Sequence, residues 1–70
     1  MNLTDARNRL VRTLLTAHRA AFDYADLMRQ EAEQRTDDVL TDPAYNAALD
    51  LYATTQRALE IAEKHQEASR

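Results

Sequence analysis

Hydrophobic residues in the first half of the chain recur every three or four positions, which is the spacing of one face of an α-helix. Two neighbouring stripes have this spacing: Leu10, Leu14, Ala17, Ala21, Tyr24 and Met28, and Val11, Leu15, His18, Phe22 and Ala25. Together they cover roughly half of the helix circumference, which is more than one neighbouring helix can bury. The pattern predicts a helix over about residues 3–35, capped by Asn2 or Thr4.

A second helix is predicted over about residues 43–67, after a polar turn at 36–42. Asp42 can cap this helix, and Pro43 suits the first helical position, where its missing N–H costs nothing. Val39 and Leu40 are expected to fold back over the hairpin end. The inner face again has two edges: Tyr45, Ala48, Tyr52, Leu59 and Gln66, and Ala44, Leu51, Ala58 and Ala62.

A short connection makes two long helices antiparallel neighbours, so the sequence predicts a single all-α domain over residues 1–70, a helical hairpin. A pivot in the middle of the turn places positions that add to about 79 at the same level, with Met28 facing Leu51 and Ala21 facing Ala58. The second apolar edge of each helix has no partner in the hairpin. Each Leu, Val, Phe or Tyr side chain left in water loses about 1.5–3 kcal/mol of the free energy that its burial would contribute.

We therefore expect a homodimer in which two hairpins form a four-helix bundle. Its core and dimer contacts are predicted at Leu10, Leu14, Ala17, Ala21, Phe22, Met28, Leu51, Tyr52 and Leu59.

The composition narrows the chemistry further. The chain has no cysteine and no glycine, which excludes disulfides and glycine-rich phosphate loops. The N-terminus lacks the apolar core of a signal peptide, and no stretch approaches the ~20 apolar residues of a membrane span. The sequence therefore predicts a soluble cytoplasmic protein.

No group of residues predicts catalysis. His18 and His65 could approach each other at the open end of the hairpin, but no further ligand has metal-site spacing. No carboxylate lies in an apolar setting that would raise its pKa, and no nucleophile has a nearby base. We expect a protein that is not an enzyme and that has no metal and no cofactor.

Charge is distributed unevenly along the chain. The first 20 residues contain four arginines and one aspartate, a net charge of +3, whereas residues 23–42 contain seven acids and two arginines, a net charge of −5. The basic end could contact phosphates, but the overall charge of −3 argues against a nucleic-acid binder. We favour the alternative that Arg12 and Arg19 pair with glutamates of the second helix. The acidic stretch would attract a basic protein surface.

A short motif around the turn carries a resemblance. The pair Thr36-Asp37, followed by Tyr45 and then by Ala48-Leu49-Asp50, resembles the phage-encoded quorum-sensing anti-activators of Pseudomonas phages, which also block a type IV pilus ATPase. In that family pattern an aromatic residue directly follows the Ala-Leu-Asp triplet. In this chain Leu51 occupies that position, and Tyr52 comes next. The likeness covers about a third of the chain.

The resemblance implies a homodimeric inhibitor in the host cytoplasm that masks host proteins, including a LuxR-type transcription activator. We expect the target-binding residues near the turn, at Asp38, Asp42, Tyr45, Leu49 and Asp50. The alternatives are a dimeric four-helix regulator that binds RNA or DNA through the basic N-terminal end, and a small assembly or chaperone subunit.

Overall fold

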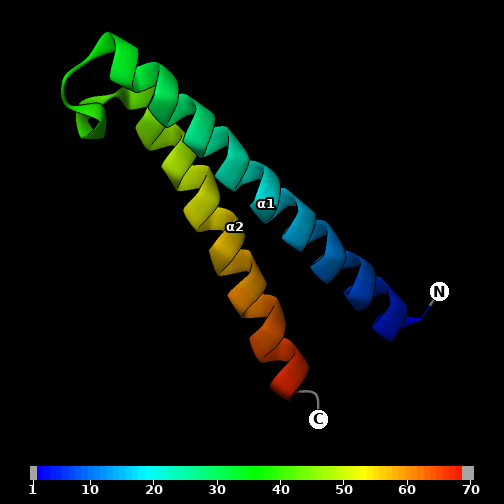
Figure 1. Cartoon of the computed structure of the whole chain (residues 1–70). Helices are drawn as coiled ribbons and strands as arrows, with labels where there is room; N and C mark the ends of the chain where they lie inside the picture. Colours follow the sequence, from blue (N-terminus) through cyan, green and yellow to red (C-terminus); the bar gives the residue numbers. More distant parts are fainter. Residues whose placement is uncertain (1, 69–70) are drawn as a thin grey trace.

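A computed structural model describes residues 2–68 as two long antiparallel helices joined by a short linker (Figure 1). Helix α1 spans Leu3–Arg35 and helix α2 spans Pro43–Ala68, with a single 3-10 turn, η1, at Val39–Thr41 between them. The all-α helical hairpin predicted from the periodicity is confirmed. Neither described helix is long and apolar enough to cross a membrane.

The helix starts follow from local side-chain chemistry. The Asn2 side chain accepts a hydrogen bond from the Asp5 N–H at 2.8 Å and caps α1. The carboxylate of Asp42 accepts from the Tyr45 N–H at 3.0 Å and caps α2, which begins at Pro43 as predicted. At the other end of α1, the extended backbone of Thr36 stops the helix, and its N–H still donates to the Ala32 carbonyl.

Small residues bring the helices together near the turn. Ala25, Ala32 and Ala48 are buried there, and the only larger buried residue in the described part of the chain is Leu59 of α2. Alanine side chains let two helix backbones approach closely, whereas leucine holds them apart. The two helices accordingly diverge toward their terminal ends, as Figure 1 shows.

The register of the hairpin differs from the prediction. His18 Nδ1 lies 2.9 Å from Thr55 Oγ1, so positions that add to 73, rather than about 79, lie at the same level. Met28 does not face Leu51, and Ala21 does not face Ala58; the shift of six positions is about 9 Å along a helix. The linker accommodates this register, and η1 within it contacts both helices.

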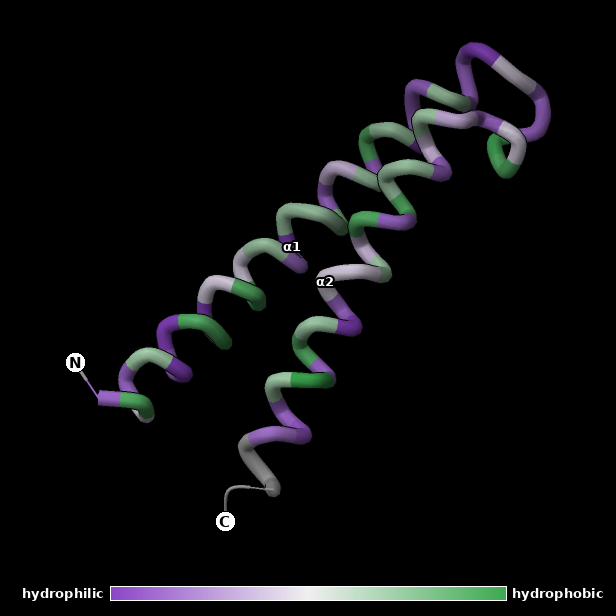
Figure 2. Tube along the Cα trace, turned by 180° about the vertical axis from the view of Figure 1, so that it is seen from behind, coloured by the Kyte–Doolittle hydropathy of each residue, from purple (hydrophilic) through white to green (hydrophobic). Residues whose placement is uncertain are grey.

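Much apolar surface stays exposed on this hairpin. Among the residues that the structure describes, nine large hydrophobic ones are exposed: Leu3, Leu10, Leu15, Phe22, Tyr24, Leu27, Leu40, Leu51 and Ile61. Figure 2 shows hydrophobic positions recurring along both helices as far as their diverging ends. The expectation that Leu40 covers the hairpin end is wrong, since its side chain is 68% exposed in η1.

Candidate interaction surfaces

An apolar groove opens between the helices where they diverge. We call it the terminal groove, and it has a volume of about 700 Å³. Its apolar lining comes from both helices: Leu3, Leu10 and Leu14 of α1, and Ala58, Ile61 and Ala62 of α2. The groove exists because α1 and α2 no longer touch closely enough here to bury these side chains against each other. It could accept apolar side chains from another polypeptide.

A second apolar surface lies on the other flank of the hairpin, and we call it the aromatic face. It consists of His18, Phe22, Tyr45, Leu49 and Tyr52. The His18 ring stacks on Tyr52 with 4.4 Å between ring centroids, and Phe22 lies 5.9 Å from Tyr52 at a tilted angle. Shallow hollows of about 190 and 310 Å³ flank the Phe22–Tyr52 pair. Such rings offer apolar area with few rotatable bonds to a binding partner.

Hydrogen bonds fix His18 in this face. The Thr55 hydroxyl donates its single proton to the Tyr52 carbonyl at 2.9 Å, so its oxygen must accept from His18 Nδ1–H. His18 therefore links α1 to α2 and orients Tyr52. His65, in contrast, lines the terminal groove, so the two histidines do not meet. Among the described residues, no three His, Asp or Glu side chains are grouped so that they could hold a metal ion.

An ion-pair cluster borders the aromatic face on α1. Arg29 pairs with Asp26 at 2.8 Å and with Glu33 one turn further along. Both carboxylates raise the pKa of the Arg29 guanidinium, Asp26 by the larger hydrogen-bond effect. The three side chains are 40–53% exposed, so these pairs orient one another and add little stability. Their charges face the solvent beside the hollow that contains Tyr45 and Leu49.

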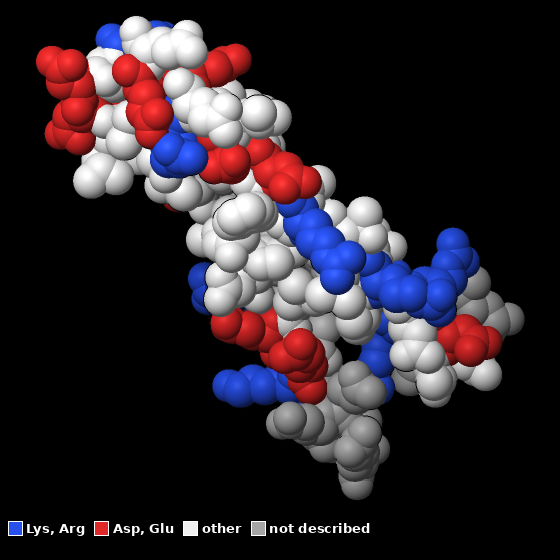
Figure 3. Space-filling model, in the orientation of Figure 1, with Lys and Arg blue, Asp and Glu red and all other residues white. Residues whose placement is uncertain are grey.

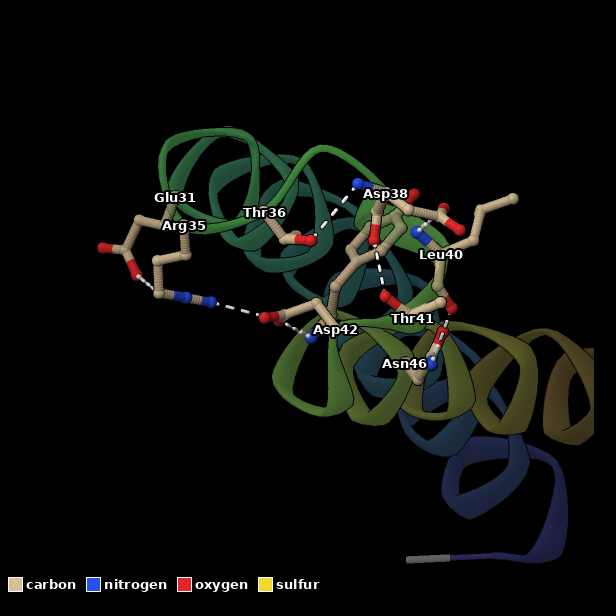
Figure 4. Close-up of polar contacts among 9 residues, drawn as sticks. Glu31, Arg35, Thr36, Asp38, Leu40, Thr41, Asp42 and Asn46 are labelled. Carbon is tan, nitrogen blue, oxygen red and sulfur yellow. Dashed lines mark hydrogen bonds and ion pairs between the residues drawn. The ribbon is translucent and has the colours of Figure 1, made fainter.

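The acids of the turn mainly hold the turn itself (Figure 4). Asp42 accepts from the Tyr45 N–H and from Arg35, which lowers the pKa of its carboxyl group, the Tyr45 N–H having the larger effect. The Asp42 side chain is only 11% exposed. Asp38 caps η1 by accepting from the Leu40 N–H at 3.1 Å, and its carbonyl accepts from the Thr41 hydroxyl at 2.8 Å.

The five predicted target-binding residues do not form one surface. Tyr45 and Leu49 are half-buried in the aromatic face, while Asp38 is exposed and Asp42 is engaged at the turn. Asp50 is exposed on another side of α2, because consecutive helical residues point about 100° apart. The sequence predicts Phe22 and Tyr52, which belong to the same aromatic face, as core or dimer residues. The four-residue spacing of His18 and Phe22 was the available signal that a second face begins there.

The predicted core and dimer positions differ in exposure within one chain. Leu59 is buried; Leu14, Ala17, Ala21, Met28 and Tyr52 are half-buried; Leu10, Phe22 and Leu51 are exposed. This gradation places the inner edge of each helix against its neighbour and leaves the outer apolar edges uncovered.

Charge is separated along the length of the hairpin. Figure 3 shows basic side chains over the N-terminal half of α1 and acidic side chains around the turn. Arg9, Arg12 and Arg19 are exposed, and in the described part of the chain no ion pair joins Arg12 or Arg19 to Glu60 or Glu63. The expected pairing of Arg12 and Arg19 is therefore wrong for Glu60 and Glu63, and the Glu67 side chain lies outside the described residues.

No protein-family model, curated protein or solved structure matches this chain. The geometry alone defines its class, which is an all-α helical hairpin with two uncovered apolar surfaces.

Proposed function

We propose that this chain acts by binding other proteins, as a homodimer that masks a working surface of its target. The observation that carries the proposal is the amount of exposed surface. The chain exposes 5581 Å², whereas a compact monomer of its mass exposes about 4,450 Å². The excess of about 1,100 Å² is larger than the ~800 Å² that each partner buries in a standard protein–protein interface.

Two apolar surfaces allow two kinds of contact at once. A four-helix bundle has one interior, so each hairpin turns one flank toward the second copy. The terminal groove and the aromatic face lie on different flanks, because Leu10 and Phe22 are about 120° apart around α1. One flank is therefore left for a target after the dimer has formed. Clusters of exposed apolar residues are typical of interaction sites.

The aromatic face, close to the turn, is the surface we assign to the target. Tyr45 presents a half-buried ring there beside Leu49. The hollows themselves are bordered by one acid and one arginine each, Asp23 with Arg19 and Asp26 with Arg29. The stretch 23–42, which includes the nearby turn, has a net charge of −5, and such a charge favours a basic partner and speeds its association. The DNA-binding part of a transcription activator is such a partner, in agreement with the resemblance to phage anti-activators. A pilus ATPase is the second host target that the resemblance suggests.

The test is titration of the DNA-binding domain of a LuxR-type activator into the protein, followed by calorimetry. Tyr45→Ala should weaken binding at least tenfold while the helical circular dichroism is retained, because the ring is a contact that only the target completes. Leu27→Ala is the control, since Leu27 is 59% exposed and belongs neither to the aromatic face nor to the stripe that contains Leu10 and Met28. Equal binding by both variants, or an equal loss, contradicts the assignment.

One observation favours nucleic-acid binding as a second candidate. Arg9, Arg12 and Arg19 are exposed on α1, and a dimer doubles that charge. Against it stand the net charge of −3 and the pI of about 5.2. The test is chromatography on heparin. Retention that falls steeply as the salt concentration rises, and that is lost in the Arg12→Ala, Arg19→Ala double variant, would support this candidate over the first.

A further inference from the structure

The hairpin is a slab only one helix thick. Its Cα extents are 50 × 19 × 12 Å, and two helices lying side by side, α1 and α2, run along its length. Domains are built from at least two packed layers around a core. A second layer laid on the 50 × 19 Å side would turn the slab into a four-helix bundle.

One flank of the slab carries apolar residues at helical spacing along both helices, and we call it the leucine face. The terminal groove forms its open end, through Leu10, Leu14, Ala58 and Ile61. Met28 and Leu51 extend the same flank toward the turn. Met28 is 18 residues, or about five full turns, after Leu10. Leu51 is seven residues, about two turns, before Ala58.

The ends of the slab carry opposite charge. The first 20 residues have a net charge of +3, and residues 51–70 add three basic and three acidic side chains, which cancel. Residues 23–42 around the turn have a net charge of −5. Figure 3 shows this separation from the turn to the N-terminal half of α1.

We infer that the leucine face binds a second copy of this chain in antiparallel orientation, so that the turn of one copy lies beside the open end of the other. This inference rests on the proposed homodimer and specifies its geometry. In a parallel dimer, two turns of charge −5 would lie side by side and repel each other. In the antiparallel dimer each acidic turn faces a basic end.

The antiparallel orientation also places large side chains of one copy opposite spaces on the leucine face of the other. A two-fold axis at the midpoint of α1, residue 19, brings Met28 opposite the partner's Leu10, since each lies nine positions from that midpoint. Met28 then reaches the partner's terminal groove, where its flexible side chain can fill an irregular space. On α2, residue 54 lies level with residue 19, which brings Leu51 to within one position of the level of the partner's Ala58, a large side chain near a small one.

Distances between spin labels test the orientation. The chain has no cysteine, so each introduced cysteine is the only labelling site. Asp37 at the turn and Thr4 at the open end are both exposed. With the axis at residue 19, two labels at Asp37→Cys should lie about 50 Å apart, given the 1.5 Å rise per residue. A mixture of Asp37→Cys and Thr4→Cys chains should give an additional separation under about 30 Å. A short Asp37–Asp37 distance, about 20 Å or two helix diameters, overturns the antiparallel arrangement and leaves the homodimer intact.

A matched pair of substitutions tests the face. Leu10 and Phe22 are 54% and 58% exposed in the single chain, so the same replacement is made at two positions of similar exposure on the two flanks of α1. Leu10→Asp should weaken the dimer roughly 100-fold or more by burying an unpaired carboxylate, and Phe22→Asp should change it only a few-fold. The measurement is sedimentation equilibrium, with circular dichroism on the same samples. If Leu10→Asp loses its helical circular dichroism together with the dimer while Phe22→Asp keeps both, that result supports the inference as well as a folded monomer does.

The results of these experiments distinguish a failure of the antiparallel arrangement from a failure of the proposed homodimer. A folded wild-type monomer of 8.0 kDa at micromolar concentration removes the homodimer and the inference together. If Phe22→Asp dissociates the dimer and Leu10→Asp does not, the aromatic face is the dimer interface. That result overturns the inference and leaves the proposed homodimer intact.

Discussion

Asp42 joins the two helices through a single carboxylate. It accepts from the Tyr45 N–H at the start of α2 and from Arg35 at the end of α1. Arg35 is in turn 3.7 Å from Glu31, so the last turn of α1 carries a short chain of charges that ends on the cap of α2 (Figure 4). A residue that the sequence placed in a target-binding surface thus determines the geometry on which that surface depends.

Asp42→Ala should lower the melting temperature by a few degrees at pH 7, because α2 loses its cap. The folded-state pKa of Asp42 is depressed, so its stabilisation is present above the unfolded aspartate pKa of about 3.9 and is lost as the pH falls through the lower folded value. The difference in melting temperature between the two proteins should therefore shrink in acid. Asp37→Ala is the control, and a gap that is constant down to pH 2 would contradict the role of the ionised carboxylate.

At the scale of the helices, side-chain size determines where α1 and α2 touch. Ala32 and Ala48 have no exposed surface, and Ala25 is nearly covered, so the close contact lies in the half of the hairpin near the turn. Beyond His18 and Thr55 the helices separate, and the terminal groove opens. The groove and the tight contact are two consequences of one distribution of alanine and leucine.

Ala48→Leu should destabilise the hairpin by about 1–3 kcal/mol, because three additional carbon atoms do not fit between closely packed helices. Ala53→Leu is the matched control, since Ala53 is exposed on α2 and its replacement meets no neighbouring helix. Urea unfolding followed by circular dichroism measures both changes. Equal stability of the two variants would show that the helices are not held at close range at Ala48.

The whole molecule is extended for its length. Its radius of gyration is 15.7 Å, whereas a compact 70-residue domain has about 11 Å. Four buried residues make up the core within the described part of the chain, and none of them is larger than leucine. Such a core is small for a domain that needs about 5 kcal/mol to stay folded. Association supplies the missing burial in the proposed dimer.

The melting temperature of the wild-type chain should therefore rise with protein concentration, since dimerisation stabilises the folded state by mass action. Circular dichroism melts over a hundredfold range of concentration measure the effect. A melting temperature that does not change over that range would mean that the hairpin is stable alone, and the homodimer would have to be abandoned.

The sequence by itself determined the helices. A spacing of three to four residues between apolar positions, with no glycine and one proline at a helix start, is enough because helix geometry repeats locally. The caps at Asn2 and Asp42 were also readable, since a cap involves only residues three positions away.

Only the tertiary structure decided which residues meet across the hairpin. The pairing of His18 with Thr55 depends on the path of the linker through η1, which no periodicity encodes. That pairing in turn brings Phe22 of α1 beside Tyr45 and Tyr52 of α2. Helix formation is governed by contacts within one turn, whereas register is fixed by the linker and by the sizes of side chains that are distant in the sequence, so the candidate surface could be located only from the folded chain.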